Sequence, residues 1–319
     1  MFRIIFIFIL IQQLSLLAQD HGNKEKVSNV LKKTFIQFKW SNDFMYETDY
    51  YYTNGFAFEV SGPWAKKNTI NSILIQSPEK SINQFGVTLV QDIYTPYERV
   101  DVEKQLDGDR PFAAYLLLGF IKKTYDPIKR NKIISELQFG VLGPLALGEE
   151  TQNGIHDMLP TSERLNGWEN QISNSVAINY SAGFYKSLYR LSWVELTGAA
   201  NGKLGIPFTH IELGGGVRIG YLNSYPKDFE VFSENRITAF LFAEVFGKAV
   251  GYNATLQGGL FSSSTYTLDV INHLAGSYRL GISVSYNLFN LEMATTFNTP
   301  EFPGALSHRW SWIVIRAGF

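Results

Sequence analysis

The sequence predicts an all-β protein, a transmembrane antiparallel up-and-down β-barrel of about twelve strands with a short helix in an extracellular loop. Long segments alternate apolar and polar side chains with a period of two residues, and aromatic residues gather where these segments end. The 27 Gly, 17 Tyr and 24 Phe among 319 residues also suit a protein of strands and turns. Alternation places one set of side chains on each face of a sheet, and aromatic girdles mark the two membrane surfaces.

The alternation is clearest in three segments, residues 131–143, 207–221 and 273–287. In the first of them, Glu136 and Gln138 flank Leu137. A soluble sandwich would show the same periodicity, with its apolar face in the core. Strands of ~10 residues or more are the length that a tilted membrane crossing requires, so their length favours the barrel.

Aromatic residues at the strand ends favour the barrel as well: Trp40, Tyr50, Tyr51, Tyr52, Tyr94, Tyr221, Tyr286, Trp310 and Trp312. The last segment, 312–319, places Ile313, Ile315 and Phe319 on one face and Arg316 on the other. A closing strand that ends in Phe resembles the signal by which the barrel-assembly machinery takes up outer-membrane barrels. An ordinary C-terminal strand is the alternative.

The predicted strands are 33–42, 52–62, 83–92, 110–123, 131–143, 171–186, 189–199, 207–221, 236–250, 273–287, 289–299 and 308–319. An even number of strands returns both ends of the chain to the periplasm. The connections predicted outside the cell are then 43–51, 93–109, 144–170, 200–206, 251–272 and 300–307. The connection 61–82 is long for a periplasmic turn, which predicts a small excursion there.

Composition sets further bounds on function and location. A formal net charge of −1 argues against a nucleic-acid partner, and the absence of Cys excludes disulfides and thiolate metal sites. Arg3 followed by the apolar run 4–10 and a small-residue end at Ala18 predicts a signal peptide over 1–18. Residues 19–319 are then a single barrel domain in the outer membrane, which we expect to be a monomer.

Two polar positions lie where the first two strands meet. Asp43 continues the polar face of the first strand beyond Ser41, and Thr53 is predicted to point inward from the second strand. Neighbouring antiparallel strands would bring the two side chains to the same wall. The alternative is a polar turn in which Asn42 and Asp43 only cap the backbone.

The long connection 144–170 contains the strongest candidate for a catalytic base. Residues 149–159 can form a short helix, in which Gln152 and His156 are four apart and share a face. His is the usual general base near neutral pH. No Gly-x-Ser-x-Gly elbow or His-x-x-x-His pair is present, and the set of Asp, Asn, Thr and Gln beside a His suits a hard cation such as Ca²⁺.

Seven short motifs occur in an order that is specific to one family: Asn42-Asp43, Tyr52–Gly55, Gln91–Pro96, Gly108–Phe112, Gly140–Pro144, Gln152–His156 and Gly167-Trp168. By these motifs the chain resembles the lipid A 3′-O-deacylase (LpxR-type) family. They cover about residues 41–171, and residues 255–258 with the barrel pattern extend a weaker match to the end.

The resemblance implies a twelve-stranded outer-membrane barrel that removes the 3′-linked acyloxyacyl chain of lipid A in lipopolysaccharide. It implies dependence on a divalent cation, usually Ca²⁺, and a site that faces the outer leaflet. His156 then corresponds to the general base, and Asp43 to its orienting carboxylate or to a metal ligand. The residues that donate hydrogen bonds around the ester would be Gln152, Asn42 and Thr53.

Two further positions follow from the same resemblance. Asp109 and Arg110 are expected to form an ion pair that braces the second outer loop. Members of the family carry an acidic residue shortly after the His. Here Glu163 serves in that role from a position displaced by one residue, or the contact is absent.

Two other functions remain open at the level of sequence. A phospholipase could use the same His and cation, and a comparison of the two lipid substrates would separate the two enzymes. A barrel that binds lipopolysaccharide or conducts solutes would use the polar, inward-facing set His210, Glu212, Arg218, Arg279 and Arg316. Such side chains usually fill a barrel of this size.

Overall fold

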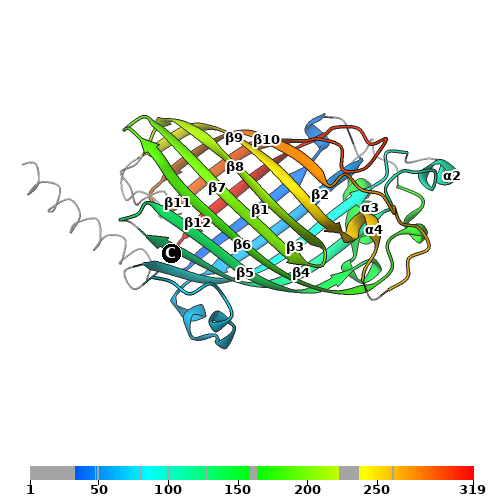
Figure 1. Ribbon diagram of the computed structural model, residues 1–319, viewed down its shortest axis with the longest axis horizontal. Helices are drawn as coiled ribbons and strands as arrows, with labels where there is room; N and C mark the ends of the chain where they lie inside the picture. The colour runs from blue at the N-terminus through cyan, green and yellow to red at the C-terminus, as the bar shows by residue number, and fades with distance from the viewer. Residues whose placement is uncertain are drawn as a thin grey trace, which may run out of the picture.

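The computed structural model describes residues 33–46, 48, 50–78, 81–98, 101–126, 128–158, 164–222, 237–260 and 262–319. The predicted signal peptide and Glu163 lie outside these residues. Figure 1 shows one long barrel of tilted strands with the short helices α3 and α4 at one end.

Twelve antiparallel strands close the barrel, each hydrogen-bonded to its neighbours in sequence, and β1 pairs with β12. They are β1 (Phe35–Asn42), β2 (Tyr51–Ser61), β3 (Ile82–Thr95), β4 (Ala113–Asp126), β5 (Asn131–Leu142), β6 (Ser175–Arg190), β7 (Val194–Gly205), β8 (Phe208–Tyr221), β9 (Ile237–Asn253), β10 (Leu274–Tyr286), β11 (Phe289–Asn298) and β12 (His308–Gly318). The predicted fold class is confirmed.

The helical elements are all short: η1 (Phe44–Tyr46), η2 (Pro63–Lys67), η3 (Thr69–Ser72), α2 (Val102–Gln105), η4 (Pro144–Ala146), α3 (Gly148–Met158), η5 (Trp168–Asn170) and α4 (Ala254–Gln257). Among the described residues, no helix has the length and apolar character needed to cross a membrane. The predicted helix over 149–159 corresponds to α3, whose last residue is Met158.

The two ends of the barrel differ in what they carry. We name the end with η1, α2, α3 and α4 the loop end, and the end where β1 begins and β12 ends the terminal end (Figure 1). The predicted outer connections fall at the loop end, and the predicted excursion between β2 and β3 falls at the terminal end, where it forms η2 and η3.

One predicted turn was misplaced. The strand predicted over 189–199 is β7, which begins at Val194 and continues to Gly205, so most of the predicted connection 200–206 is strand. The β7–β8 connection at the loop end is only residues 206–207, and the preceding turn, between β6 and β7, lies at residues 191–193, where the Leu191 N–H donates to the Val194 carbonyl at 2.8 Å. No Gly, Pro or Asn marks this turn, and an irregularity between Ser187 and Tyr189 shifts the register beside it.

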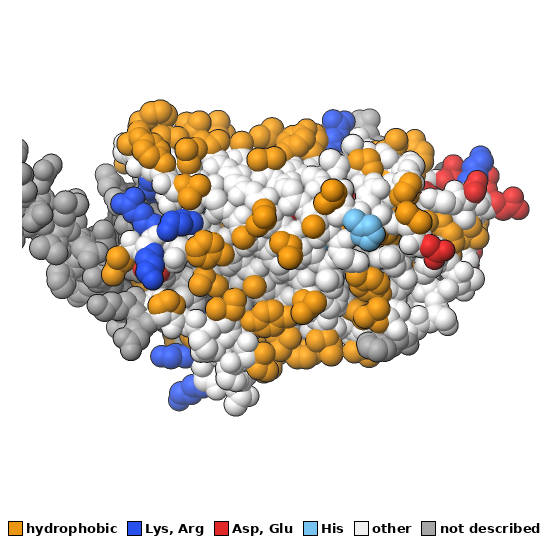
Figure 2. Space-filling view, viewed as in Figure 1, with side chains coloured by type: hydrophobic (Ala, Val, Ile, Leu, Met, Phe, Trp, Pro, Cys, Tyr) orange, Lys and Arg blue, Asp and Glu red, His pale blue; other side chains and the backbone are white. Residues whose placement is uncertain are grey.

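The lumen is lined by charged side chains that pair with one another. The ion pairs that line it include Lys123–Glu59 at 2.8 Å, Arg190–Glu195 at 3.0 Å, Arg279–Glu244 at 3.6 Å and Arg316–Glu292 at 3.6 Å. Apolar side chains of the outward set stay exposed, among them Leu213, Leu241 and Leu280. Figure 2 shows such hydrophobic side chains along the length of the barrel surface. This distribution is that of a lipid-facing wall around a polar interior.

Candidate functional site

Helix α3 packs on the outer face of the barrel wall, over β3 and β4. Asp92 of β3 points into the lumen, where Tyr52 donates to its carboxylate at 2.9 Å, so its neighbour Gln91 points outward. The Gln91 amide donates to the Ala146 carbonyl at 2.6 Å and to the Thr151 hydroxyl at 3.2 Å. These two bonds fix the start of α3 against the wall.

An apolar cluster lies beneath this end of the helix. It consists of Ile93, Phe112, Ala114, Ala146 and Trp168, all of them nearly inaccessible to solvent. A Cβ at Gly148 would come within 2.4 Å of the Ala114 side chain, so only glycine lets the first turn of α3 sit this close to the wall. Gly148 and the cluster therefore set the distance between α3 and the wall.

A β-bulge turns Thr53 to the outside of the barrel. The pairing of β2 with β3 shifts between Tyr52 and Asn54, which leaves Thr53 as the extra residue. Tyr52 and Gly55 face the lumen, because a Cβ at Gly55 would strike the Tyr52 hydroxyl. Strict alternation had predicted that Thr53 points inward. The prediction was wrong because the bulge adds one residue to the strand.

Thr53 and Gln152 join the wall to the helix. The Thr53 hydroxyl lies 3.5 Å from the Gln152 Oε1 and 3.4 Å from the Ile93 carbonyl, and both side chains are almost fully buried. Gln152 lies in the middle of α3, so its buried face is the one directed at the wall. His156 follows one helical turn later on the same side of the helix and is partly exposed.

Asn42 adds a third polar group to this outward-facing surface. Its amide donates to the Thr53 carbonyl at 2.9 Å, across the β1–β2 pair. The same amide lies 3.4 Å from the Asn54 Oδ1, which also accepts a bond from the Trp40 indole at 3.0 Å. These contacts tie the bulge to β1 and hold the Thr53 carbonyl in place.

Asp43 comes next in the chain and organises the tight loop between β1 and β2. Its carboxylate accepts from the Thr48 hydroxyl at 2.9 Å and from the Tyr50 N–H at 3.2 Å. It is 2% exposed although it carries a formal charge. The loop therefore holds a buried carboxylate one residue after Asn42, and burial raises the pKa of Tyr50.

The residues around this site offer oxygen atoms rather than a ready cage for a metal. Within the described ranges, no group of three or more His, Asp and Glu stands close enough to hold a metal ion. The oxygen donors in this region are the Asp43 carboxylate, held by the β1–β2 loop, and the neutral oxygens of Thr53 and Gln152. Ca²⁺ takes 6–8 oxygen ligands, so this set fits a hard cation only when water or substrate completes the shell.

An exposed ion pair joins Arg164, which follows α3 in the chain, to Asp157 near the end of that helix. The Arg164 guanidinium contacts the Asp157 carboxylate at 2.5 Å and donates to it a second time at 2.9 Å. The hydrogen bond from Arg164 lowers the pKa of Asp157 below its ordinary value. The Leu165 N–H also donates to the Asn153 side chain at 3.2 Å, which closes the loop against the helix.

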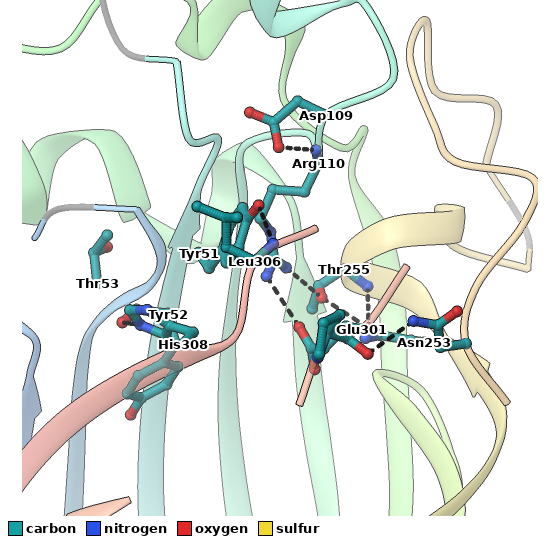
Figure 3. A network of polar contacts seen from close by, with 12 residues as sticks. Tyr51, Tyr52, Thr53, Asp109, Arg110, Asn253, Thr255, Glu301, Leu306 and His308 are labelled. Carbon is teal, nitrogen blue, oxygen red and sulfur yellow. Dashed lines mark hydrogen bonds and ion pairs between the residues drawn. The ribbon is translucent and has the colours of Figure 1, made fainter. Parts of the chain in front are cut away.

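A separate network closes the loop end over the lumen (Figure 3). Arg110 is completely buried; it pairs with Glu301 at 3.3 Å, donates to the Thr255 hydroxyl at 2.9 Å and stacks on Tyr94. The predicted partner, Asp109, instead accepts backbone N–H bonds from Arg110 at 2.7 Å and from Tyr97 at 2.6 Å. The predicted ion pair between Asp109 and Arg110 is wrong, because the guanidinium turns inward while the carboxylate caps the loop.

Figure 3 also separates this network from Thr53, which lies apart from it. His308 belongs to the network side: it is 6% exposed, and its ring Nε2 lies 3.0 Å from the Tyr52 carbonyl. The loop end thus has an inner network that plugs the lumen and an outer surface that carries the predicted site residues.

Gln91 and Asn54 also belong to the outer surface, although they were not among the site residues predicted from the sequence. Both occupy positions whose neighbours on the same face, such as Leu89 and Phe56, are apolar and face lipid. A polar side chain on the lipid-facing set is costly unless something covers it. That exception to the pattern was the signal that could have located the covering helix.

The comparisons with known proteins agree with the fold. The family described as "Outer membrane protein LpxR" matches residues 4–318. The solved structure "LpxR from Salmonella typhimurium" superposes with a TM-score of 0.72 at 21% identity, and it covers 89% of this chain and 100% of that chain. No curated protein matched.

The β domain of the Bordetella autotransporter BrkA gives a TM-score of 0.43 at 9% identity, covering 89% of this chain and 98% of that one. That likeness is too weak to support an argument about this fold. The match to the family spans nearly the whole chain, and the Salmonella structure shares its closed barrel. The chain therefore belongs to the LpxR family of outer-membrane proteins.

Proposed function

We propose that this protein hydrolyses the 3′-linked acyloxyacyl ester of lipid A, at the surface between the barrel wall and α3. The observation that carries the proposal is the outward orientation of Thr53 and its contact with Gln152. A membrane lipid can reach this surface sideways from the bilayer, whereas the lumen is closed by the network around Arg110. The loop end would lie at the cell surface, where the glucosamine headgroups are.

The proposed chemistry uses the residues of α3 and the bulge. His156 takes a proton from a water molecule, whose oxygen attacks the ester carbonyl carbon. Gln152, Asn42 and Thr53 lie around the ester, where hydrogen bonds to the developing oxyanion lower the barrier. His156 then returns the proton to the sugar oxygen as the carbon–oxygen bond breaks. The products are a sugar hydroxyl and a free 3-acyloxy fatty acid.

Asp43 has one of two roles in this reaction. It orients the imidazole of His156, or it provides the one carboxylate ligand of a Ca²⁺ ion beside Thr53 and Gln152. When bound, such a cation supplies positive charge that offsets the oxyanion. A single protein carboxylate corresponds to weak affinity, since calcium affinity rises with the number of charged ligands.

The test is mass spectrometry of hexa-acylated lipid A after incubation with detergent-folded protein, with Ca²⁺ or with EDTA. The proposal expects a cation-dependent loss of one acyloxyacyl unit. A parallel incubation with phosphatidylethanolamine separates the reaction from that of a phospholipase. Release of fatty acid from the phospholipid alone would reject lipid A as the substrate, and lack of hydrolysis together with ion conductance in planar bilayers would favour a pore.

Two further points complete the proposal. The outward face of β12, which ends in Gly318 before Phe319, is the segment expected to engage the barrel-assembly machinery. We also expect a monomer. Crosslinking in native membranes, followed by gel electrophoresis under folded conditions, tests both expectations.

A further inference from the structure

The connection between β2 and β3 lies beside the barrel wall rather than beneath its opening. We name residues 62–78, which include η2 and η3, the side segment; Figure 1 shows it projecting from the flank of the barrel near the terminal end. Its backbone meets two side chains of the wall: Lys122 Nζ donates to the Ile75 carbonyl at 3.0 Å, and the Ile75 N–H donates to the Ser135 hydroxyl at 3.1 Å.

These wall residues belong to the outward-facing set. The next residue after Lys122, Lys123, pairs with Glu59 in the lumen at 2.8 Å, so Lys122 points the other way. Lys122 is nevertheless only 5% exposed. A charged side chain on the lipid-facing wall is unfavourable, and the side segment removes it from lipid by covering it.

The side segment has a fixed shape of its own. Asn68 caps η3 by accepting from the Ile70 N–H at 2.9 Å, and the Asn71 amide donates to the Ala65 and Lys66 carbonyls at 2.9 and 3.0 Å. The Gln76 amide reaches three more carbonyls of the segment, the shortest of these bonds being 2.7 Å to Leu74. Leu74 itself is 1% exposed against the wall.

The side segment exposes both apolar and basic side chains. Trp64 and Ile73 are 53% and 59% exposed, and Lys66 and Lys67 are exposed beside them. Strand ends of the terminal end also carry exposed aromatic residues: Tyr189, Trp193, Tyr221 and Tyr286. Aromatic residues at this level mark the membrane surface, so the side segment lies where the wall meets the headgroups.

The terminal end is also rich in basic residues. Figure 2 shows Lys and Arg side chains gathered there and Asp and Glu side chains at the loop end. Phospholipid headgroups carry phosphate, and each Lys close to an anionic membrane surface contributes roughly a fivefold gain in binding. Lys66 and Lys67 follow closely after Trp64 in the chain, and Trp is a residue type enriched at membrane–water interfaces.

We propose that the side segment is a membrane-surface anchor that binds anionic phospholipids of the leaflet at the terminal end. Trp64 and Ile73 insert among the upper acyl chains, and Lys66 and Lys67 contact headgroup phosphates. The segment thereby sets how deep this flank of the barrel sits in the bilayer. This role is independent of the hydrolytic site, which lies at the opposite end of the barrel.

The depth of the segment can be measured directly, because the chain contains no Cys. Single spin labels at Trp64→Cys and Ile73→Cys, in protein reconstituted into vesicles of phosphatidylcholine and phosphatidylglycerol, should be accessible to oxygen and shielded from a water-soluble nickel chelate. A label at Glu103→Cys, exposed on α2, is the control and should be open to the chelate. If the nickel chelate reached the labels at positions 64 and 73 as readily as the label at position 103, the proposal would be overturned. The exposed side chains would then be available to a soluble partner.

The contribution of Lys66 and Lys67 to the binding of anionic lipid can be tested separately. Native mass spectrometry should show the folded protein retaining phosphatidylglycerol in preference to phosphatidylcholine. Lys66→Gln with Lys67→Gln should weaken that preference by about tenfold or more, given the contribution of each Lys near an anionic surface. The matched control is Lys104→Gln, whose side chain is 69% exposed at the loop end. An unchanged preference in the double variant contradicts the assignment, whatever the hydrolytic activity.

Discussion

The Thr53 hydroxyl lies 3.5 Å from the Gln152 Oε1, although Thr53 belongs to a barrel strand and Gln152 to a helix about a hundred residues later. The contact exists because a bulge in β2 turns Thr53 outward and because Gly148 lets α3 approach the wall. It places a hydroxyl and an amide on the lipid side of the barrel, one turn from His156.

The hydroxyl of Thr53 can be removed without changing the shape of the side chain. Thr53→Val should lower kcat/KM on lipid A by about tenfold or more, because it leaves the buried Gln152 amide without this partner. Thr53→Ser keeps the hydroxyl and is the matched control. Equal losses in both variants would show that packing at this position, not the hydroxyl, matters.

The docking of α3 rests on Gln91. Gln91→Leu removes the bonds to the Ala146 carbonyl and the Thr151 hydroxyl, so the first turn of α3 should exchange its amide hydrogens faster and activity should fall. Leu89→Ala, two residues earlier on the same outward face, is the control. Unchanged exchange in Gln91→Leu would mean that the apolar cluster around Trp168 alone holds the helix.

Much of the fold follows from the alternation of apolar and polar residues with a period of two. The structure deviates from the sequence prediction at positions where one residue breaks that alternation. The twelve strands and the assignment of connections to two ends were predicted, since long alternating segments leave few alternatives. The direction of Thr53 was not, because a bulge leaves no mark in composition. The partner of Arg110 was missed because Glu301 lies in a distant loop that only the closed barrel brings near.

The inner network should be important for stability. Glu301→Gln leaves the fully buried Arg110 guanidinium without its counterion and should cost about 3 kcal/mol of unfolding free energy, the range for breaking one side of a buried pair. Arg110→Met should cost less, about 1 kcal/mol, because the Glu301 carboxylate that it leaves behind is one-third exposed and can be hydrated, so that the main loss is the hydrogen bond to Thr255. Urea titration, followed by the gel mobility of unheated samples, measures the unfolding free energy of both variants. The reverse order of the two losses would contradict the network.

The ion pair between Asp157 and Arg164 gives a pH dependence with a defined sign. Because Arg164 lowers the pKa of Asp157 in the folded state, the contribution is present above the ordinary Asp pKa of ~3.9 and is lost as pH falls through the folded value. The last turn of α3 should therefore open a few-fold more in acid.

Asp157→Asn gives the reference for this effect. The ratio of amide exchange between Asp157→Asn and the unmodified protein should exceed one at pH 6 and approach one near pH 3. Glu103→Gln, an exposed acid on α2, should give a ratio near one at both pH values. A ratio for Asp157→Asn that does not change with pH would show that the pair does not hold the end of α3.

In the proposed reaction His156, which α3 presents on the lipid side of the wall, activates the water that cleaves lipid A. The most direct measurement compares unmodified protein and His156→Ala on hexa-acylated lipid A by mass spectrometry, with folding of both verified by heat-modifiable gel mobility. We expect loss of the acyloxyacyl unit with the unmodified protein and a rate lower by about 10²-fold or more in the variant. Undiminished hydrolysis by a folded His156→Ala barrel would contradict it.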